Sequence, residues 1–245
     1  MDINLGMLEA ILPEFDLEVI HAYLPLLLKA TLVTMYLAFL SGIFGTIIGV
    51  ACAVIRITPF VILNRVISFY IWLMRGLPTL ILILFVYYGL PAFSIVLDPF
   101  PAAVLALSLN AGAFWAEIFR AGIEAIPMGQ WDAARALGLR FRPLMSKVIF
   151  PQAFRIVVPP YLNGLITLAK DTSLVSAITV TELTLTAQRA YASSFRPLEI
   201  LMVATILYLI LTSTLMVAQQ ITERRLRLPS SVASFRELRT QVRRA

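Results

Sequence analysis

The chain has 245 residues, of which 60% are hydrophobic and 14% are charged, and its mean hydropathy is +0.87. Soluble domains carry roughly 25% charged residues, so this composition excludes an ordinary soluble protein and indicates an integral membrane protein. The formal net charge is +6, but the basic residues gather at the ends of apolar runs and in the C-terminal tail, which is typical of membrane topology and not of nucleic-acid binding.

The first 25 residues are predicted to form a segment on the periplasmic side. Residues 1–18 contain five acidic residues and no Lys or Arg. A signal peptide needs a basic start before its apolar core, so this segment is not one. The pattern of residues 3–12 predicts a short amphipathic helix on the membrane surface.

Residues 26–222 are predicted to hold about five transmembrane helices. The first runs over about residues 26–55, where Gly42, Gly45 and Gly49 share one face and allow another helix to approach closely. The second covers about residues 67–90 and is interrupted at Arg75-Gly76-Leu77-Pro78. Because Pro78 removes a helix hydrogen bond, we expect a kink or break there.

Arg75 and two polar residues of the third span need special placement. An arginine inside an apolar run is costly against lipid, so we expect Arg75 near the cytoplasmic end or facing the protein. The third span covers about residues 101–121. Its Asn110 and Glu117 lie seven residues apart, which places them on one helix face.

Residues 130–152 form a charged island between apolar runs. Asp132 begins a helical pattern, Gly138 interrupts it, and Arg142-Pro143 opens a second short helix that we expect to end at Pro151. The island also carries Arg135, Arg140 and Lys147. On these residues alone, packing onto the chain's own bundle and docking to a partner are equal alternatives.

The fourth span is expected to begin near residue 156 and to be broken early by Pro159-Pro160. Lys170-Asp171-Thr172-Ser173 follows close to the bilayer midplane. Residues 179–196 read as a polar outside connection, and residues 197–222 as the fifth span. Residues 223–245 form a basic cytoplasmic tail, whose last part from residue 231 fits an amphipathic helix about as well as disorder.

The distribution of basic residues sets the predicted orientation. With the N-terminus outside and the C-terminus cytoplasmic, 16 of the 20 Lys and Arg residues fall on the cytoplasmic side. Cytoplasmic loops of membrane proteins carry this excess of positive charge. The sequence therefore predicts an all-α integral membrane protein with an odd number of spans in this orientation.

Four polar groups lie deep in the predicted spans: Asn110, Glu117, Lys170 and Asp171. Each is costly in lipid unless it faces a cavity or a polar partner. They either join helices through hydrogen bonds and an ion pair, or line a pathway for a polar solute. Intramembrane ionisable groups usually mark pathways, which favours the second interpretation.

No motif for catalysis or cofactor binding occurs in the chain. It lacks the phosphate loop GxxxxGK[ST], so it does not hydrolyse ATP by that route. It also lacks HExxH, CxxC and GxSxG, and its single cysteine, Cys52, excludes a disulfide or thiolate metal site within the chain. We therefore expect no enzyme activity, no bound cofactor and no metal. Active transport would take its energy from an ion gradient or a partner chain.

The island resembles the cytoplasmic signature of permease subunits of bacterial ATP-binding-cassette importers. That signature reads EAA, three residues, G, nine residues, I, one residue, LP. Asp132-Ala133-Ala134, Gly138, Val148 and Phe150-Pro151 fall in its register. The departures are Asp for Glu, Val for Ile and Phe for Leu.

A second likeness points to the permeases of the histidine, glutamine and arginine systems. Arg75-Gly76-Leu77-Pro78 resembles their RG[TS]P segment, with Leu77 departing from it. Asn110 with Ala116-Glu117-Ile118, Pro151-Gln152-Ala153, and Lys170-Asp171-Thr172-Ser173-Leu174 with Glu182-Leu183 are also similar to that subfamily. The resemblance extends over most of the chain from Arg75 to Leu183.

The resemblance implies a type I importer permease with about five spans, in a bacterial inner membrane, that moves a polar amino acid. Its partners would be a second permease, an ATPase subunit that uses ATP and Mg²⁺, and an external solute-binding protein. The implied translocation residues are Asn110, Glu117, Lys170, Asp171, Thr172 and Ser173. The implied ATPase-coupling residues are Asp132, Ala133, Ala134, Ala136, Gly138 and Leu139. The alternative is a secondary transporter driven by an ion gradient, for which five spans are few.

Overall fold

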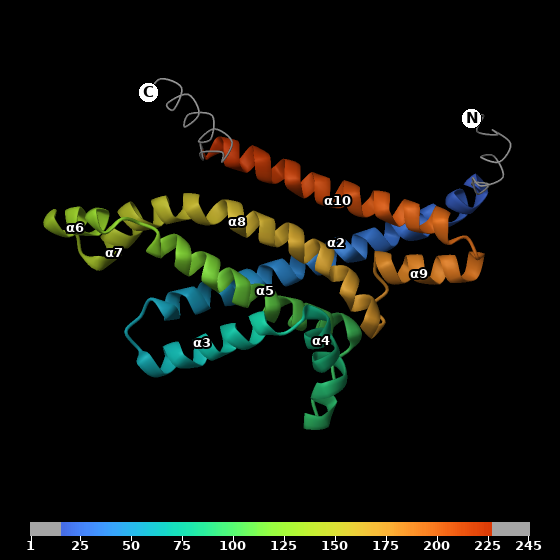
Figure 1. Ribbon diagram of the computed structural model, residues 1–245, viewed down its shortest axis with the longest axis horizontal. Coiled ribbons are helices and arrows are strands. Elements are labelled where there is room, and N and C mark those ends of the chain that lie inside the picture. Colours follow the sequence, from blue (N-terminus) through green and yellow to red (C-terminus); the bar gives the residue numbers. More distant parts are fainter. Residues whose placement is uncertain (1–15, 227–245) are drawn as a thin grey trace, which may run out of the picture.

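The computed structural model describes residues 16–226, which are almost entirely helical and contain no strand (Figure 1). The helices are α2 (Leu17–Arg56), α3 (Val61–Gly76), α4 (Thr79–Leu84), α5 (Pro99–Glu124), α6 (Met128–Ala136), α7 (Phe141–Leu144), α8 (Phe150–Asp171), α9 (Leu183–Ser194) and α10 (Pro197–Arg225). Shorter π and 3-10 turns are η1 (Phe85–Gly89), η2 (Leu90–Phe93), η3 (Met145–Ile149) and η4 (Thr172–Ile178). The helices predicted over residues 3–12 and in the tail from residue 231 lie outside the described residues.

Within the described range, three helices are long and apolar enough to cross a membrane: α2, α5 and α10. The bent pair formed by α3 and the segment from α4 to η2 adds a fourth if it acts as one span. The remaining long helix, α8, has 22 residues but carries Arg155, Lys170 and Asp171. The all-α membrane fold is thus confirmed, while the count of five spans and the orientation stay predictions.

Helix α2 is longer than the predicted first span. Its 40 residues extend about 60 Å at the helical rise, roughly twice the thickness of a bilayer's hydrocarbon core. It begins at Leu17 because the Asp16 side chain accepts hydrogen bonds from the N–H groups of Glu18 and Val19. The helix therefore begins before the span predicted over about residues 26–55, and the expected domain division after residue 25 falls inside this helix.

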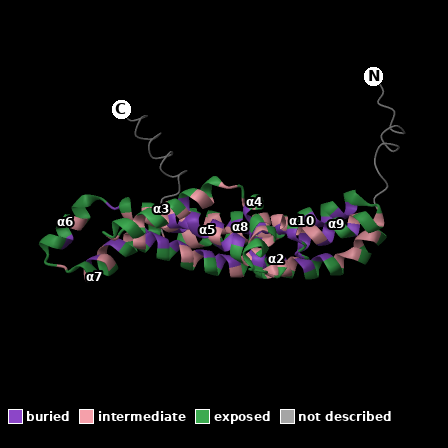
Figure 2. Cartoon of the chain, turned by 90° about the horizontal axis from the view of Figure 1, so that it is seen from below, coloured by how far each residue is buried: buried purple, intermediate pink, exposed green. Residues whose placement is uncertain are grey.

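The centre of the bundle is the close contact between α2 and α5. A Cβ atom added to Gly45 would lie 2.9 Å from the Trp115 ring, and one added to Gly112 would lie 2.7 Å from Ile48. Both distances are too short for carbon atoms, so only glycine permits this approach. Figure 2 shows buried residues concentrated where α2, α5 and α8 meet. The predicted glycine face is confirmed, and it packs inside this chain.

Gly112→Ala is expected to destabilise the protein by about 1–3 kcal/mol, the usual range for overpacking a well-packed core. The added methyl would meet the β-branched Ile48 at its Cβ and Cγ2 atoms, which have little freedom to move away. A lower thermal midpoint of the purified protein checks this. Gly129→Ala is the control, because nothing lies within 4 Å of its added Cβ. Equal midpoints for the two variants would contradict the packing argument.

The second predicted span is broken, as expected. Helix α3 ends at Gly76, Leu77 is extended, and α4 starts after Pro78, so that the two helical segments differ in direction by 109°. Figure 1 shows α4 turning away from α3. Arg75 lies fourteen residues into α3, about 21 Å from its start, and its guanidinium is 5.5 Å from the centre of the Phe114 ring. Arg75 is exposed apart from this contact, and its depth in the membrane stays a prediction.

Two expectations about prolines are wrong. Pro159 and Pro160 lie inside α8 without breaking it. Prolines are tolerated in membrane helices because neighbouring groups satisfy the freed carbonyls. The second short helix also does not end at Pro151. Helix α7 continues through the π turn η3 directly into α8, with Pro151 in the first turn of α8, where its missing N–H is least costly.

The predicted polar connection over residues 179–196 contains helix α9. Leu183, Ala187 and Ala190 are buried there and pack with Leu27 of α2 and Ile200 of α10. Figure 1 places α9 at one end of the molecule, beside α10, and α6 and α7 at the opposite end. The molecule thus presents two separate terminal regions joined by the long helices.

Candidate functional site

A small cavity with a few polar groups in its lining lies between α4, α5 and α8. Its volume is about 240 Å³, and it is lined by Thr79, Leu107, Asn110, Ala111, Phe114, Trp115, Ile118, Gly164, Thr167, Leu168 and Asp171. Asn110 and Asp171, which are far apart in the sequence, therefore line the same space. Apolar walls with a few convergent polar groups are typical of small-molecule sites.

Asn110 has a structural role at this cavity. Its amide nitrogen donates to the Met74 carbonyl at 3.2 Å, and its amide oxygen accepts from the Thr79 hydroxyl at 3.5 Å. Met74 lies in the last turn of α3, where carbonyl groups lack helical partners. The side chain thus connects both sides of the α3–α4 break to α5. One edge of the cavity is fixed by this contact.

Asp171 is the last residue of α8 and the only acidic residue of the cavity lining. Among the described residues, no side chain forms a hydrogen bond or ion pair with its carboxylate. A half-buried carboxylate without such a partner is costly in apolar surroundings. The group is therefore suited to receive a cationic or N–H-bearing part of a ligand.

The neighbours of Asp171 do not share its position. Lys170 is exposed and outside the cavity lining. Thr172 is fully buried and donates to the Ala169 carbonyl at 2.8 Å, and Ser173 donates to the Lys170 carbonyl at 2.8 Å. Only Asp171 of this predicted group of four lines the cavity, because the helix tightens to the 3-10 turn η4 directly after it.

Glu117 also lies outside the cavity lining. Its carboxylate is 2.6 Å from Arg120 in the same helix and 4.0 Å from Arg56 of α2. Arg120 contacts Glu124 as well, and Arg56 contacts Ser68 of α3. Glu117 therefore joins the ends of neighbouring helices, which was the alternative interpretation for these groups. This carboxylate already has cationic partners.

Two features of the cavity were not predicted from the sequence: its aromatic walls, and the position of Arg75 beside one of them. The Arg75 guanidinium lies against Phe114, and Phe114 lines the cavity. The indole of Trp115 occupies the space left by Gly164, where an added Cβ would lie 2.3 Å from the indole nitrogen. The signal available in the sequence was the energetic cost of an arginine within an apolar run. No pattern in the sequence marks Trp115 or Gly164.

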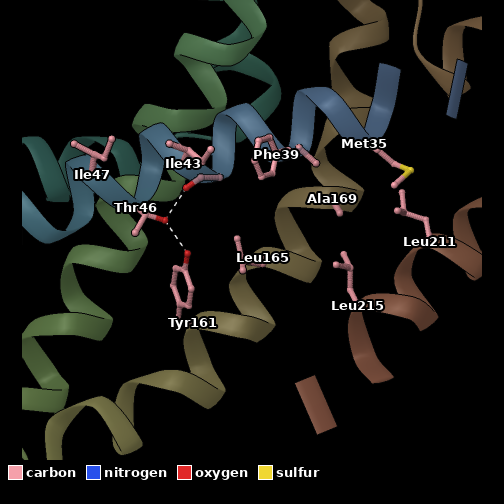
Figure 3. Close-up of a pocket in the computed structure, with 12 residues that line it drawn as sticks. Met35, Phe39, Ile43, Thr46, Ile47, Tyr161, Leu165, Ala169, Leu211 and Leu215 are labelled. Atoms are coloured by element: carbon pink, nitrogen blue, oxygen red, sulfur yellow. Dashed lines mark hydrogen bonds between the residues drawn. The ribbon is translucent and has the colours of Figure 1, made fainter. Parts of the chain in front are cut away.

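A larger cavity of about 570 Å³ lies between α2, α8 and α10 (Figure 3). Its lining is apolar except for Thr46 and Tyr161, whose hydroxyls bond to each other at 2.7 Å. Thr46 also donates to the Gly42 carbonyl at 2.6 Å. This cavity offers no charged side chain to a zwitterion, so the smaller cavity is the candidate site for a polar solute.

The island at the far end of the molecule has the predicted helix–glycine–helix form. Gly138 has a φ of +72°, a left-handed conformation that favours glycine, and it separates α6 from α7. The large apolar side chains of Met128, Leu137 and Phe141 are 66%, 80% and 68% exposed. Figure 2 shows α6 and α7 as mostly exposed. Such a cluster of exposed apolar side chains is typical of a protein-binding surface.

The predicted coupling residues divide into exposed and buried groups. Asp132, Ala133, Ala136 and Gly138 are exposed. Ala134 is 3% exposed and packs with Ile126, Leu144, Ile149 and Ala153, and Leu139 is packed against the same cluster. These two residues therefore pack the island onto α8, while docking of its exposed residues to a partner stays a prediction.

Asp132 does not start its helix. Helix α6 begins at Met128, directly after Pro127, and Asp132 lies in its middle. Its carboxylate is 3.7 Å from the Arg135 guanidinium, one turn further on. The prediction that the helical pattern begins at Asp132 is therefore wrong, because Pro127 sets the start of the helix earlier. Its exposed carboxylate remains accessible to a partner.

The structure has the features of a membrane transport protein. These are long apolar helices, an exposed helical island at one end, and a small cavity with an unpaired carboxylate. Residues 45–228 match the family of binding-protein-dependent transport system inner membrane components, and the chain belongs to this family. Its similarity to permeases of amino-acid ABC transporters does not support the alternative of a secondary transporter.

Named relatives extend over most of the chain. It is 40% identical to the L-cystine transport system permease protein TcyB of Bacillus subtilis (strain 168), over 84% of this chain and 88% of that protein. It is 36% identical to the glutamine transport system permease protein GlnP of Escherichia coli (strain K12), over 88% of this chain and 99% of that protein.

Solved structures show the same fold. One crystal structure of an amino acid ABC transporter with histidines matches with a TM-score of 0.81 at 33% identity, over 86% of this chain and 98% of the solved chain. An inward-facing structure of the MetNI methionine ABC transporter matches with a TM-score of 0.72 over 84% and 98% of the two chains. Its identity is 23%, so this second likeness shows the fold alone. The type I importer permease fold predicted from the sequence is thus confirmed.

Proposed function

We propose that this chain is the membrane-spanning permease subunit of an ATP-driven importer for polar amino acids. The observation that carries the proposal is the Asp171 carboxylate, which lines a cavity of about 240 Å³ without a partner among the described residues. An amino acid as the ligand of this cavity is supported by the relatives named for L-cystine and glutamine transport. The amino acid transporter solved with histidines supports it as well.

The cavity supplies complementary groups for a zwitterion. The substrate ammonium would bind Asp171, and the threonine hydroxyls of Thr79 and Thr167 would add hydrogen bonds. The substrate carboxylate would lie toward Arg75, which is held beside the cavity wall by Phe114. Neither Arg75 nor Lys170, the donor expected from the sequence, lines the cavity, but only Arg75 lies against a lining residue, Phe114. Arg75 takes the place of Lys170 in this proposal.

The island would couple the cavity to the energy source. An ATPase partner, which uses ATP and Mg²⁺, would bind the exposed surface formed by Met128, Leu137 and Phe141, together with Asp132, Ala133, Ala136 and Gly138. Ala134 and Leu139 fix this surface to α8. Since α7, η3 and α8 are continuous, movement of the island would reach Asp171 through one helix. Closure of the ATPase would then shift the spans between inward-open and outward-open states.

The remaining partners follow from the same proposal. A second permease subunit would complete the pathway in the bacterial inner membrane, and an external solute-binding protein would deliver the amino acid to the end that holds α9. This chain would bind no cofactor, and the ATPase activity would belong to the separate partner subunit.

A ligand screen tests the proposal. The assembled complex is heated with each of the common amino acids in turn, and its thermal midpoint is recorded. Ligands that bind the folded state raise the midpoint by mass action, so a subset of polar amino acids is expected to do so. A complex that no amino acid stabilises, while a different class of solute does, would contradict the assignment.

A further inference from the structure

We propose that Glu182 is a positioning residue that holds Asp171 in the cavity. This inference rests on the proposed function of that cavity. Glu182 is fully buried, yet it lies outside the cavity lining. Nothing in its role as a helix-starting residue requires a carboxylate this deeply buried, because helix caps work equally well at an exposed surface.

The Glu182 carboxylate is held by hydrogen bonds from several elements. One oxygen accepts from the Leu185 N–H at 2.8 Å, and the other accepts from the Thr184 N–H at 2.8 Å and the Tyr208 hydroxyl at 2.9 Å. Thr34 of α2 lies 3.5 Å from the second oxygen and accepts from the Leu183 N–H at 3.1 Å. No Lys or Arg among the described residues forms an ion pair with it. Helices α2, α9 and α10 therefore meet at one buried carboxylate.

Buried residues connect this centre to the cavity. Val175 and Ile178 of η4 are fully buried and belong to the same core cluster as Leu107, Trp115 and Leu168, which line the cavity. Thr172 is fully buried and directly follows Asp171. The segment between Asp171 and Glu182 is therefore packed into the core beside the cavity. Figure 1 shows α9 and α10 lying together beside this end of α8.

The connection between Asp171 and Glu182 is itself constrained. The 3-10 turn η4 ends at Thr179, which has a φ of 65°, an unusual conformation for a β-branched residue. Ile178, Val180 and Leu183 around it are 0%, 4% and 0% exposed. Such a conformation persists only where the surroundings over-determine it. The short segment thus transmits the position of Glu182 to the end of α8.

Tyr208→Phe tests the inference, because it removes the hydroxyl and keeps the ring. Uptake by the reconstituted complex, counted per assembled transporter, is expected to fall roughly tenfold, as the loss of one buried hydrogen bond would produce. In an Asp171→Asn background the same change is expected to lower the residual uptake by less than about twofold, because its effect passes through Asp171.

Tyr23→Phe is the matched control, since its hydroxyl bonds to Ser193 of α9 and does not reach Glu182. It is expected to change uptake by less than about twofold. An equal loss from Tyr208→Phe in both backgrounds, or unchanged uptake in the native background, would overturn the positioning role. Unchanged uptake by Asp171→Asn alone would instead overturn the cavity assignment, and this inference with it.

Discussion

Asp171→Asn is expected to lower amino-acid uptake about tenfold to a hundredfold. The variant keeps the shape of the side chain but removes the charge that would bind the substrate ammonium. Hydrogen bonds to charged groups contribute about 1.5–3 kcal/mol, and each 1.4 kcal/mol corresponds to a factor of ten. Initial uptake rates in proteoliposomes that hold the complete complex measure the effect.

Asp98→Asn provides the matched control for this variant. Asp98 is exposed just before α5, and its side chain makes no cap hydrogen bond there. The same substitution at this position is expected to leave uptake unchanged. If Asp171→Asn transported as well as Asp98→Asn, with both complexes assembled normally, the Asp171 carboxylate would have no place in the substrate site.

The double variant Leu137→Asp with Phe141→Asp is expected to lose its ATPase partner. Both side chains are exposed, by 80% and 68%, so the substitutions leave the chain's own core intact. Large apolar side chains at the centre of an interface commonly contribute 2 kcal/mol or more each. The affinity for the ATPase should therefore fall by more than about a hundredfold, as measured by co-purification and titration of the two subunits.

Ile62→Asp is the control for the docking surface. Ile62 is 81% exposed in the first turn of α3, at the helix end that the predicted orientation places on the cytoplasmic side. We expect this variant to bind the ATPase normally. A double variant that still co-purified with the ATPase at native affinity would show that the partner binds elsewhere.

Local rules predicted several parts of the fold correctly. The glycine face around Gly45 was predictable because small residues at helical spacing have few other uses in a membrane helix. The break at Pro78 followed from a missing hydrogen-bond donor next to a flexible glycine. The same rule failed at Pro159 and Pro160, because the packing of α8 in the bundle outweighs the local preference.

The candidate site was predictable only in part. Depth and polarity singled out Asn110 and Asp171, and the structure places both at one cavity. The predicted depth in the membrane did not distinguish the role of Asp171 from that of Glu117. The partners of Glu117 include Arg56, which lies more than sixty residues earlier in the chain. Glu182 is likewise buried because α2 and α10 pack around the start of α9. Such contacts between distant segments are not encoded in the local pattern of charges.

The most direct test of the account is uptake in proteoliposomes whose ion gradients are collapsed by ionophores. The permease, its ATPase and the solute-binding protein are reconstituted together, and labelled amino acid is supplied on the binding-protein side. We predict accumulation that requires ATP on the ATPase side and is lost with Leu137→Asp plus Phe141→Asp. Accumulation driven by an ion gradient, without ATP or the ATPase, would contradict the account.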